Sequence, residues 1–350
     1  MGHKVRFEPV GVEIDVEEDE TILAAAFRQG LMLMHGCKEG QCSACKSFLL
    51  DGELDMERYS TFALADYERE EGYVLLCRAH AYSDLEVELI NYDEDVLRSA
   101  TPIVEALTEV AAVDALTHDV RRLLLRLLDP PEMAFTPGQY VDVTIPGTDQ
   151  IRSFSMANTP SSAGELELLI KIYPGGRFSG LLDHDLGIGD RLQVKGPYGL
   201  CTLRPGSERD LIMVGGGAGL GPLLSLLRCL AESSSTREVT FYYGARTRRD
   251  LFYLDELAGL EERLSGLRFV PALSEPEAGD AWEGETGLVT DVVDAREPDL
   301  SDRDAYLCGP PPMVDAAVAL FAVKGIPESR IHFDKFTASA EAAVAPTSHP

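Results

Sequence analysis

Three cysteines in one short loop constrain this chain more than any other feature of its sequence. Cys37, Cys42 and Cys45 follow the spacing C-x4-C-x2-C, and Cys77 stands thirty-one intervening residues further on. The loop is rich in small residues, namely Gly36, Gly40, Ser43 and Ala44. Small residues let a backbone wrap tightly round one centre, so that several thiolates point inward and backbone N–H groups face the sulfur atoms.

This spacing resembles that of the plant-type ferredoxins, in which four thiolates hold a [2Fe–2S] cluster. A zinc site is an alternative, because Cys42 and Cys45 form a C-x2-C pair, but zinc sites usually repeat that pair. A second alternative is four unrelated buried cysteines, although these four cluster and the chain holds only seven in all. We therefore predict a [2Fe–2S] cluster that carries single electrons, with Cys37, Cys42, Cys45 and Cys77 as its ligands.

The net charge of the chain argues against a nucleic-acid partner and is compatible with a less acidic protein partner. The 350-residue chain has a net charge of −28, which argues against nucleic-acid binding. Residues 1–95 hold 22 acidic and 8 basic side chains, or −14, so the first quarter of the chain carries half the net charge. These charges form either a solvated face or an acidic surface that steers a less acidic partner to the cluster.

Length and cysteine usage indicate two or three domains in a reducing compartment. An odd number of cysteines, four of them assigned to a cluster, makes a disulfide framework improbable and favours the cytoplasm. The first residues hold no apolar signal core, and the longest uncharged run, 211–227, is glycine-rich and short for a membrane span. We expect a soluble cytoplasmic protein with no membrane partner.

The first ninety-five residues have the element order of a β-grasp ferredoxin domain. Alternating patterns predict strands over 4–8 and 12–16, and an alanine-rich segment ended by a glycine predicts a helix over 22–30. The cysteine loop follows, and further strands are expected over 46–50 and 85–89. We place this domain at residues 1–95 and a linker at 96–101.

Short strands separated by regular turns predict an antiparallel β-barrel over residues 101–204. Strands are expected over 103–107, 120–127 and 189–199, and residues 135–145 are expected to form a turn that runs into a strand. Two motifs lie inside this region: Arg152-Ser153-Phe154-Ser155 and Gly175-Gly176-Arg177-Phe178-Ser179. Taken singly, the arginine could be a surface cation and the glycines a hairpin turn.

Together the two motifs resemble the flavin motifs of the ferredoxin-NADP reductase superfamily, Arg-x-Tyr/Phe-Ser and Gly-Gly-x-x-Ser. The resemblance implies FAD, with Arg152 on its pyrophosphate beside the start of a helix over 178–186. It makes Ser155 a catalytic residue that hydrogen-bonds the flavin nitrogen accepting hydride, and it puts Phe154 where many relatives have Tyr. The predicted flavin-binding residues are Arg152, Ser153, Phe154, Ser155, Lys171, Gly175, Gly176 and Ser179.

From residue 209 to 336 the pattern changes to that of a doubly wound parallel sheet. A strand over 210–214 leads into the glycine loop Gly215, Gly216, Gly217 and Gly219, and a helix is expected over 223–231. Further strands are expected over 239–246 and 305–308. Strand, glycine loop and helix let a backbone approach a dinucleotide pyrophosphate, although such a loop can also be only a tight turn.

The superfamily resemblance extends to this region. It implies that Cys308, the second expected catalytic residue, lies near the reacting nicotinamide carbon with Gly309 and Pro310; a small buried side chain is the alternative. Arg246 would bind the dinucleotide, and Phe336 ends a segment similar to the family's C-terminal Glu-Lys-Phe. NADH is the expected donor and NADPH the alternative. Residues 337–350 have the composition of a disordered tail.

The order of the three domains resembles the single-chain reductases of bacterial oxygenases, most closely those of soluble propane and methane monooxygenases. The segments that carry this likeness are 36–42, 75–78 and 250–257. The resemblance implies electron transfer from NADH through FAD and the cluster to a diiron hydroxylase, with a small coupling protein as a further partner. A reductase of phenol or toluene monooxygenases or of ring-hydroxylating dioxygenases is one alternative. A redox sensor with relic flavin modules is another, against which Arg152 and Ser155 argue.

Overall fold

The chain divides into two compact units, Met1–Ile103 and Val104–Pro350. The computed structural model describes residues 2–92, 97, 101–162, 164–277, 279 and 281–336. The expected disordered tail, 337–350, lies outside the described residues, as does most of the expected linker. No helix among the described residues has both the length and the apolar composition to cross a membrane.

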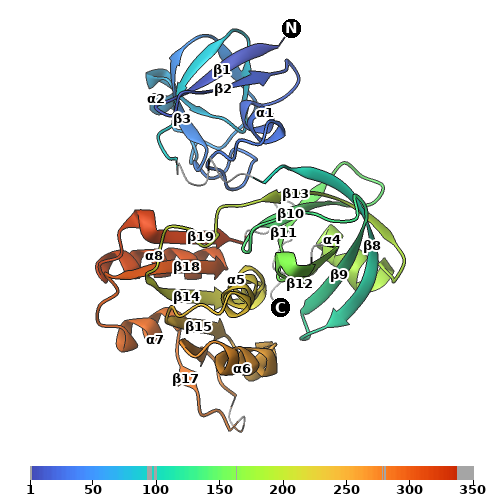
Figure 1. Cartoon of the computed structure of the whole chain (residues 1–350), viewed down its shortest axis with the longest axis vertical. Coiled ribbons are helices and arrows are strands. Elements are labelled where there is room, and N and C mark those ends of the chain that lie inside the picture. The colour runs from blue at the N-terminus through green and yellow to red at the C-terminus, as the bar shows by residue number, and fades with distance from the viewer. Residues whose placement is uncertain are drawn as a thin grey trace, which may run out of the picture. The chain divides into compact units, whose positions relative to one another are not determined.

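The first unit is a mixed five-stranded sheet with one helix packed on it (Figure 1). The strand order is β2-β1-β7-β3-β5, and β1 runs parallel to β7. The strands are β1 (His3–Glu8), β2 (Val12–Val16), β3 (Lys46–Asp51), β5 (Tyr73–Leu75) and β7 (Leu85–Glu88). A two-stranded sheet pairs β4 (Leu54–Met56) with β6 (Ala79–Ala81), and the helices are α1 (Ile22–Arg28) and α2 (Asp66–Glu71).

The core of this unit follows from its alternating sequence. Val5 and Phe7 of β1 and Val16 of β2 are fully buried, and α1 buries Ile22 and Ala25. Thr21 caps α1 by accepting a hydrogen bond from the Ala24 N–H, which fixes where the helix begins. This is the predicted β-grasp arrangement, and it leaves residues 29–45 as the loop that carries three cysteines.

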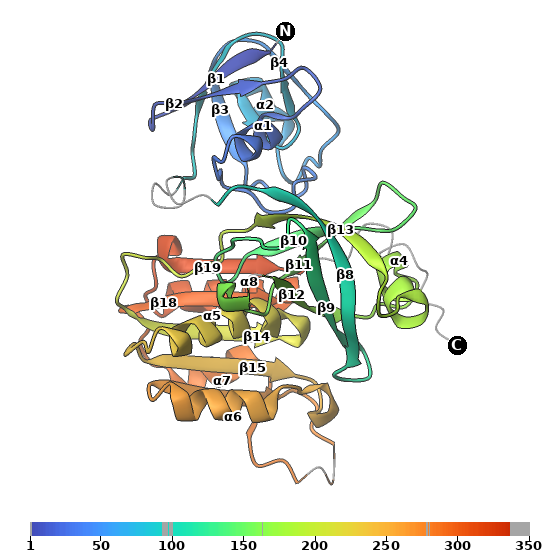
Figure 2. The same ribbon diagram turned by 45° about the vertical axis from the view of Figure 1, so that its right-hand side comes forward.

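The second unit begins with an antiparallel six-stranded sheet that curls into a barrel (Figure 2). Its order is β11-β10-β13-β8-β9-β12, and a bridge between Met156 and Leu168 links the two ends. The strands are β8 (Val104–Ala115), β9 (Val120–Asp129), β10 (Tyr140–Thr144), β11 (Ile151–Ser155), β12 (Glu165–Lys171) and β13 (Arg191–Tyr198), with a short helix η1 (Pro160–Ser162) before β12. Val141, Leu166 and Leu168 are among the side chains that fill its interior.

A parallel six-stranded sheet completes the unit, in the order β17-β16-β15-β14-β18-β19. The strands are β14 (Asp210–Gly216), β15 (Val239–Ala245), β16 (Leu267–Leu273), β17 (Glu285–Thr286), β18 (Arg303–Gly309) and β19 (Ile331–Lys335). The helices are α5 (Leu220–Glu232), α6 (Leu254–Arg263), α7 (Val289–Arg296) and α8 (Pro311–Val323), with short turns η3 (Gly217–Gly219), η4 (Arg248–Asp250) and η5 (Glu328–Arg330). Helices α5 and α6 cover one face and α7 and α8 the other, so the predicted doubly wound fold is confirmed (Figure 1).

Barrel and parallel sheet share one apolar cluster, which explains why they form a single unit although two domains were expected. Val120 and Leu169 of the barrel pack with Leu220 and Leu223 of α5. The topological switch point of the sheet lies between β14 and β18, where chain direction around the sheet reverses. Ligands of such sheets bind at that point, next to the barrel in this chain.

Three element boundaries differ from the sequence prediction. Strand β8 runs to Ala115, eight residues beyond the expected end at 107. The expected helix 178–186 is a short helix, α4 (Arg177–Gly180), continued by the π-helical turn η2 (Leu181–Asp185). Helix α5 begins at Leu220, because Gly215 and Gly216 belong to β14 and the next three residues already turn as η3.

Candidate functional site

The four cysteines meet as two pairs of side chains. Cys37 is hydrogen-bonded to Cys42, and Cys45 to Cys77. The Cys42 thiol, together with backbone N–H groups, lowers the pKa of Cys37 to about 5, whereas the pKa of Cys42 is raised. Cys45 and Cys77 are buried and Cys42 is exposed, so one pair lies inside the fold and the other reaches its surface.

Backbone N–H groups of the loop point at the sulfur atoms. Those of Glu39 and Gln41 donate to Cys37 Sγ over 3.4 and 3.1 Å, and the Cys37 N–H donates to Cys42 Sγ over 3.2 Å. Gly40 adopts φ +70°, and a Cβ there would lie 2.8 Å from the Cβ of Tyr59. The loop therefore needs a glycine to close, and its donors stabilise negative charge on sulfur.

This pairing fits a [2Fe–2S] cluster better than a single zinc ion. Two irons that share four cysteines take two thiolates each, which is the observed grouping. A tetrahedral zinc ion instead brings four sulfurs within about 3.8 Å of one another. Among the described residues, the only His, Cys, Asp or Glu group with three ligand atoms within 4.8 Å of one another is His118, Asp119 and Asp250.

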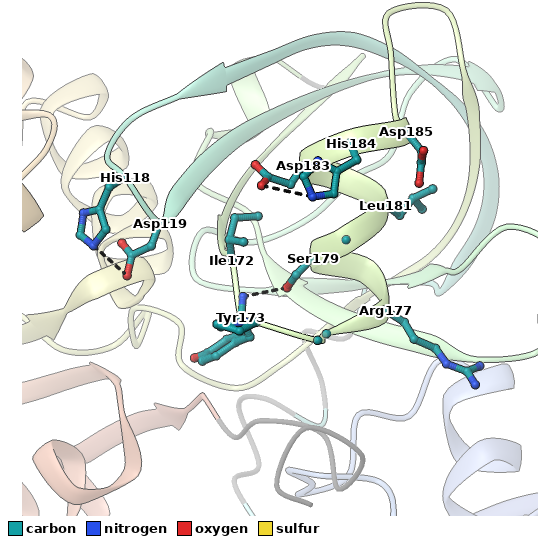
Figure 3. Close-up of a pocket in the computed structure, with 14 residues that line it drawn as sticks. His118, Asp119, Ile172, Tyr173, Arg177, Ser179, Leu181, Asp183, His184 and Asp185 are labelled. Carbon is teal, nitrogen blue, oxygen red and sulfur yellow. Dashed lines mark hydrogen bonds and ion pairs between the residues drawn. The ribbon is translucent and has the colours of Figure 1, made fainter. Parts of the chain in front are cut away.

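The glycine motif of the barrel opens onto a cavity of about 630 Å³ (Figure 3). Gly175 has φ +75° and open space where a Cβ would be, so a ligand can approach its backbone. At Gly176 a Cβ would crowd Ser179 Oγ at 3.0 Å, and that hydroxyl accepts a hydrogen bond from the Tyr173 N–H. The lining residues are His118, Asp119, Ile172, Tyr173, Pro174, Gly175, Gly176, Arg177, Ser179, Gly180, Leu181, Asp183, His184 and Asp185.

Ion pairs offset two of the three carboxylates in this cavity. Lys171 pairs with Asp119 at 2.8 Å, and Arg121 pairs with Asp183 at 2.6 Å. Burial opposes ionisation of Asp119, but Lys171 prevails and lowers the pKa of that carboxyl. The predicted flavin-binding residue Lys171 does not line the cavity itself, but it neutralises Asp119, one of the acids that do.

The two barrel motifs meet through aromatic side chains. Phe154 of β11 packs on Phe178 of α4, with ring centroids 4.8 Å apart. Strand side chains alternate between faces, so Arg152 shares the face of Phe154 while Ser153 and Ser155 share the other. The Ser153 hydroxyl donates to Asp142 Oδ1 over 2.6 Å, so the structure gives it a protein partner, and its contact with flavin stays a prediction.

The glycines of the nucleotide loop fall into two groups. A Cβ at Gly219 would lie 2.1 Å from the Cys308 carbonyl oxygen, and one at Gly216 would lie 2.9 Å from the Met313 sulfur. Gly215 is enclosed in the same way, by Leu223 and Phe241. Only Gly217, with φ +56°, has open space where its Cβ would be. Packing accounts for the others, so of the four predicted residues Gly217 is the best placed to meet a ligand.

Three strand ends converge at Cys308. It lies opposite Gly215 of β14 on one side and opposite Asp334 of β19 on the other. Burial, aided by a hydrogen bond to Cys201, raises the pKa of the Cys308 thiol well above its usual range. Burial also raises the pKa of Asp334 to about 7, and its Oδ2 atom has no hydrogen-bond partner. The site thus places a neutral thiol beside a carboxyl that holds its proton near neutral pH.

The remaining predicted residues flank this point. Gly309 has φ +148° and its carbonyl accepts a hydrogen bond from the Phe336 N–H over 2.9 Å, while Pro310 caps α8. Arg246 follows the end of β15 and is exposed. Phe336 therefore lies beside the Cys308–Gly309 turn, whereas Arg246 lies at the end of a different strand.

Sequence reasoning missed Cys201, Asp119 and Tyr140. Cys201 contacts Cys308, Asp119 pairs with Lys171, and Tyr140 lies opposite Ser155 between β10 and β11. One signal was available: three cysteines remained after the cluster was assigned, and Cys201 closely follows the last barrel strand. The other two contacts depend on strand register, which local sequence does not specify.

Three family models match the chain in the predicted order. Residues 5–82 match the 2Fe-2S iron-sulfur cluster binding domain, 107–202 the oxidoreductase FAD-binding domain and 213–319 the oxidoreductase NAD-binding domain. The predicted cofactors, a [2Fe–2S] cluster, FAD and NADH, are therefore confirmed. The chain is an NADH-dependent oxidoreductase that uses flavin and iron–sulfur.

Similar proteins cover almost the whole chain. It is 52% identical to the propane 2-monooxygenase reductase component of Rhodococcus jostii (strain RHA1), over 97% of this chain and 92% of that protein. It is 37% identical to the phenol 2-monooxygenase reductase component of Pseudomonas sp. (strain CF600), over 98% of this chain and 97% of that protein. The crystal structure of Amycolatopsis cytochrome P450 reductase GcoB matches with a TM-score of 0.88 and 34% identity, over 97% of this chain and 100% of that one. The chain belongs to the ferredoxin-NADP reductase superfamily and, within it, to the family of flavin and iron–sulfur reductases that includes the reductase components of propane 2-monooxygenase.

Proposed function

We propose that this chain delivers electrons from NADH to the diiron hydroxylase of a propane-type soluble monooxygenase in the cytoplasm. The observation that carries the proposal is the 52% identity to a propane 2-monooxygenase reductase component over 97% of the chain. The phenol 2-monooxygenase relative is more distant, at 37%. A small coupling protein is the further partner expected for such an assembly.

In this proposal the residues of the chain bind the cofactors and position them relative to one another. Cys37, Cys42, Cys45 and Cys77 hold the cluster. When bound, the dinucleotide supplies two electrons as hydride, FAD accepts them and the cluster passes them on singly. The chain itself supplies orientation, so no acid–base dyad or nucleophile is needed.

The flavin is held from two sides in this proposal. Arg152 and the open backbone of Gly175 bind the pyrophosphate, with Gly176 and Ser179 shaping the turn. Phe154 supports the ring system, and Ser155 hydrogen-bonds the nitrogen that receives hydride. The contact between Phe154 and Phe178, at 4.8 Å between ring centroids, supports one continuous site for both motifs.

The dinucleotide lies across the switch point of the parallel sheet. Gly217 accepts the close approach of its pyrophosphate, and Cys308, with Gly309 and Pro310, borders the nicotinamide. Arg246 lies at the end of β15, the neighbouring strand, where a ribose would be read. We propose that NADH is preferred to NADPH; comparing kcat/KM for the two donors tests this preference, and a higher value with NADPH contradicts it.

The domain boundaries that go with this function are 1–95, 101–204 and 209–336. The family matches at 5–82, 107–202 and 213–319 each lie inside one of these ranges. The sheet of each proposed domain is also complete within its own range. These two observations support one cofactor for each domain.

A spectrum of the purified protein tests the electron path. We expect flavin and iron–sulfur absorption bands at roughly 350–550 nm. Anaerobic addition of NADH should bleach both bands. A protein without a flavin band, or with bands that NADH leaves unchanged, would be a redox sensor with relic modules, and the reductase proposal would be wrong.

The partner is tested with purified hydroxylases. NADH oxidation coupled to product formation should be faster with a propane-type diiron hydroxylase than with a phenol hydroxylase or a ring-hydroxylating dioxygenase at the same concentration. Efficient turnover with either of the last two instead would assign the chain to the alternative oxygenase class. Adding the coupling protein of the propane system should raise product yield per NADH.

A further inference from the structure

Two buried cysteines outside the cluster touch each other at the nucleotide site. The sulfur atoms of Cys201 and Cys308 lie 3.7 Å apart, although 107 positions separate the residues in the chain. Their exposed fractions are 2% and 0%. The contact is an S–H···S hydrogen bond in which either thiol can be the donor, and both side chains are shielded from solvent.

The backbone of each cysteine is fixed by a glycine. Gly138, with φ +93°, has no room for a Cβ, which would lie 2.1 Å from the Cys201 carbonyl oxygen. A Cβ at Gly219 would likewise lie 2.1 Å from the Cys308 carbonyl oxygen. The turn before β10 thus holds Cys201, and the start of α5 holds Cys308.

A continuous row of contacts links this pair to the flavin strand. Ser155 lies opposite Tyr140, and Tyr140 lies opposite Tyr198 with ring centroids 5.6 Å apart. Gly199 follows directly, and a Cβ there would lie 2.9 Å from the Tyr140 ring. Cys201 is two residues further on. The segment from Tyr198 to Cys201 therefore bridges the residue proposed to face the flavin and the residue proposed to border the nicotinamide.

We propose that Cys201 is a positioning residue for hydride transfer, holding the Cys308 sulfur in one place relative to Ser155. The Cys308 sulfur shares an S–H···S hydrogen bond with Cys201 and accepts the backbone N–H of Asp334. Together these two contacts restrict the orientation of the Cys308 side chain. This inference rests on the proposed roles of Ser155 and Cys308 in hydride transfer.

The test is anaerobic stopped-flow reduction of bound FAD by NADH, which yields a limiting rate and an apparent Kd for NADH. Cys201→Ala removes the hydrogen-bonding partner of Cys308, and Cys201→Val removes it while keeping the space filled. We expect both variants to lower the limiting rate about five- to tenfold and to change the Kd for NADH less than about twofold. The loss of rate is smaller than the roughly hundredfold loss that a 1 Å misplacement of reacting groups can cause. Cys201→Ser, which keeps a hydrogen-bonding group, should recover most of the rate.

The matched control is Cys229→Ala, the same chemical change in a thiol of α5, and it should react at the wild-type rate. Because Cys201 acts through Cys308, Cys201→Val should cause no further loss in a Cys308→Ala background. Wild-type limiting rates in both Cys201→Ala and Cys201→Val, or an undiminished loss in the Cys308→Ala background, would overturn the inference.

The same data separate this inference from the function on which it rests. A wild-type rate in Cys308→Ala alone removes the proposed role of Cys308 and the inference with it. A slow Cys308→Ala protein beside fast Cys201 variants removes only the inference. Rates are compared per bound FAD, so a variant that loses part of its flavin still gives a reading.

Discussion

Two glycines of the nucleotide loop, two positions apart, serve different purposes. Gly217 has φ +56° and open space where a Cβ would be, whereas a Cβ at Gly219 would lie 2.1 Å from the Cys308 carbonyl oxygen. The first is open to a ligand, and the second allows the sheet and α5 to pack. Local sequence presents them as equivalent members of one motif, and only the packing of β18 distinguishes them.

Gly217→Ala should therefore weaken NADH binding, while Gly219→Ala should destabilise the fold. An alanine at 217 places a methyl group in the proposed pyrophosphate approach and adds about 1–2 kcal/mol of left-handed backbone strain. We expect the apparent Kd for NADH to rise about tenfold, equivalent to about 1.4 kcal/mol, with FAD content unchanged. Gly219→Ala should lower Tm; an unaltered Kd in Gly217→Ala would contradict this division.

Asp334 predicts a pH dependence of stability. Burial raises its pKa to about 7, above the ordinary value of 3.8, so the folded protein binds this proton more tightly than the unfolded chain. The resulting stabilisation is complete below about pH 4 and is lost as pH rises through 7, with a ceiling of about 4 kcal/mol.

Asp334→Asn, which mimics the protonated acid, should remove this loss. We expect its Tm to equal that of the wild type at pH 5 and to exceed it by several degrees at pH 8.5, at about 2–4 °C per kcal/mol. Thermal unfolding at both pH values, with FAD in excess, gives the comparison. A Tm difference that is the same at both pH values would rule out titration of Asp334.

Cys77 supplies a test of the cluster ligands. Replacing it with alanine leaves one sulfur of the buried pair without its partner and should abolish electron delivery to cytochrome c. Reduction of FAD by NADH, followed with ferricyanide as acceptor, should continue because the second unit is unchanged. Wild-type cytochrome c reduction by Cys77→Ala would remove Cys77 from the proposed ligand set.

Among the elements, those with a buried and an exposed face were predictable and those without were not. Strands β1 and β2 alternate cleanly, and their positions were predicted within one residue. Beyond Val110, β8 pairs with β9 but buries nothing, so its last five residues carry no alternating signal. The cysteine loop and the glycine motifs are local patterns and could be found, whereas Asp334 joins the site through strand register and Cys201 through a side-chain contact across 107 positions.

An ion network ties the elements of the second unit together. Arg228 of α5 pairs with Glu167 of β12 at 2.6 Å and with Glu256 of α6 at 2.7 Å. Burial opposes ionisation of Glu167, yet Arg228 and its other partners prevail and lower the pKa of this carboxyl. The network therefore joins the barrel to the helices of the parallel sheet.

Arg228→Met should cost about 3 kcal/mol of unfolding free energy, because it leaves a buried carboxylate short of its partner. Lys195→Met is the control, since Lys195 and Glu105 form a largely exposed pair at 2.7 Å worth about 0–1 kcal/mol. Urea unfolding, followed by the release of FAD fluorescence, measures both. Equal urea midpoints for the two variants would show that the network adds no stability.

Charge acts on the scale of the whole molecule. Residues 1–95 carry −14 of the total −28, so they hold the same net charge as residues 96–350 although they are far fewer. The attraction that this charge provides is thus directed at other molecules rather than within the chain. Salt at 0.1 M screens such attraction beyond about 10 Å.

Raising the salt concentration should slow electron transfer to a basic acceptor and speed it to an anionic one. Cytochrome c, which is basic, should be reduced several-fold more slowly between about 0.02 and 0.3 M NaCl, and ferricyanide faster, because screening removes attraction in one case and repulsion in the other. A rate with cytochrome c that is flat over this range would leave the acidic residues as a solvated face only.

The chain divides after Ile103, so the unit that holds the four cluster cysteines, Met1–Ile103, is a module that can be exchanged between proteins. It has its own sheet, its own helices and all four cluster cysteines, so a gene fusion can exchange it as one piece. Evolution or protein engineering can then direct the same flavin module to a new oxygenase by exchanging this N-terminal unit. The unit has about a hundred residues, which is a typical domain size.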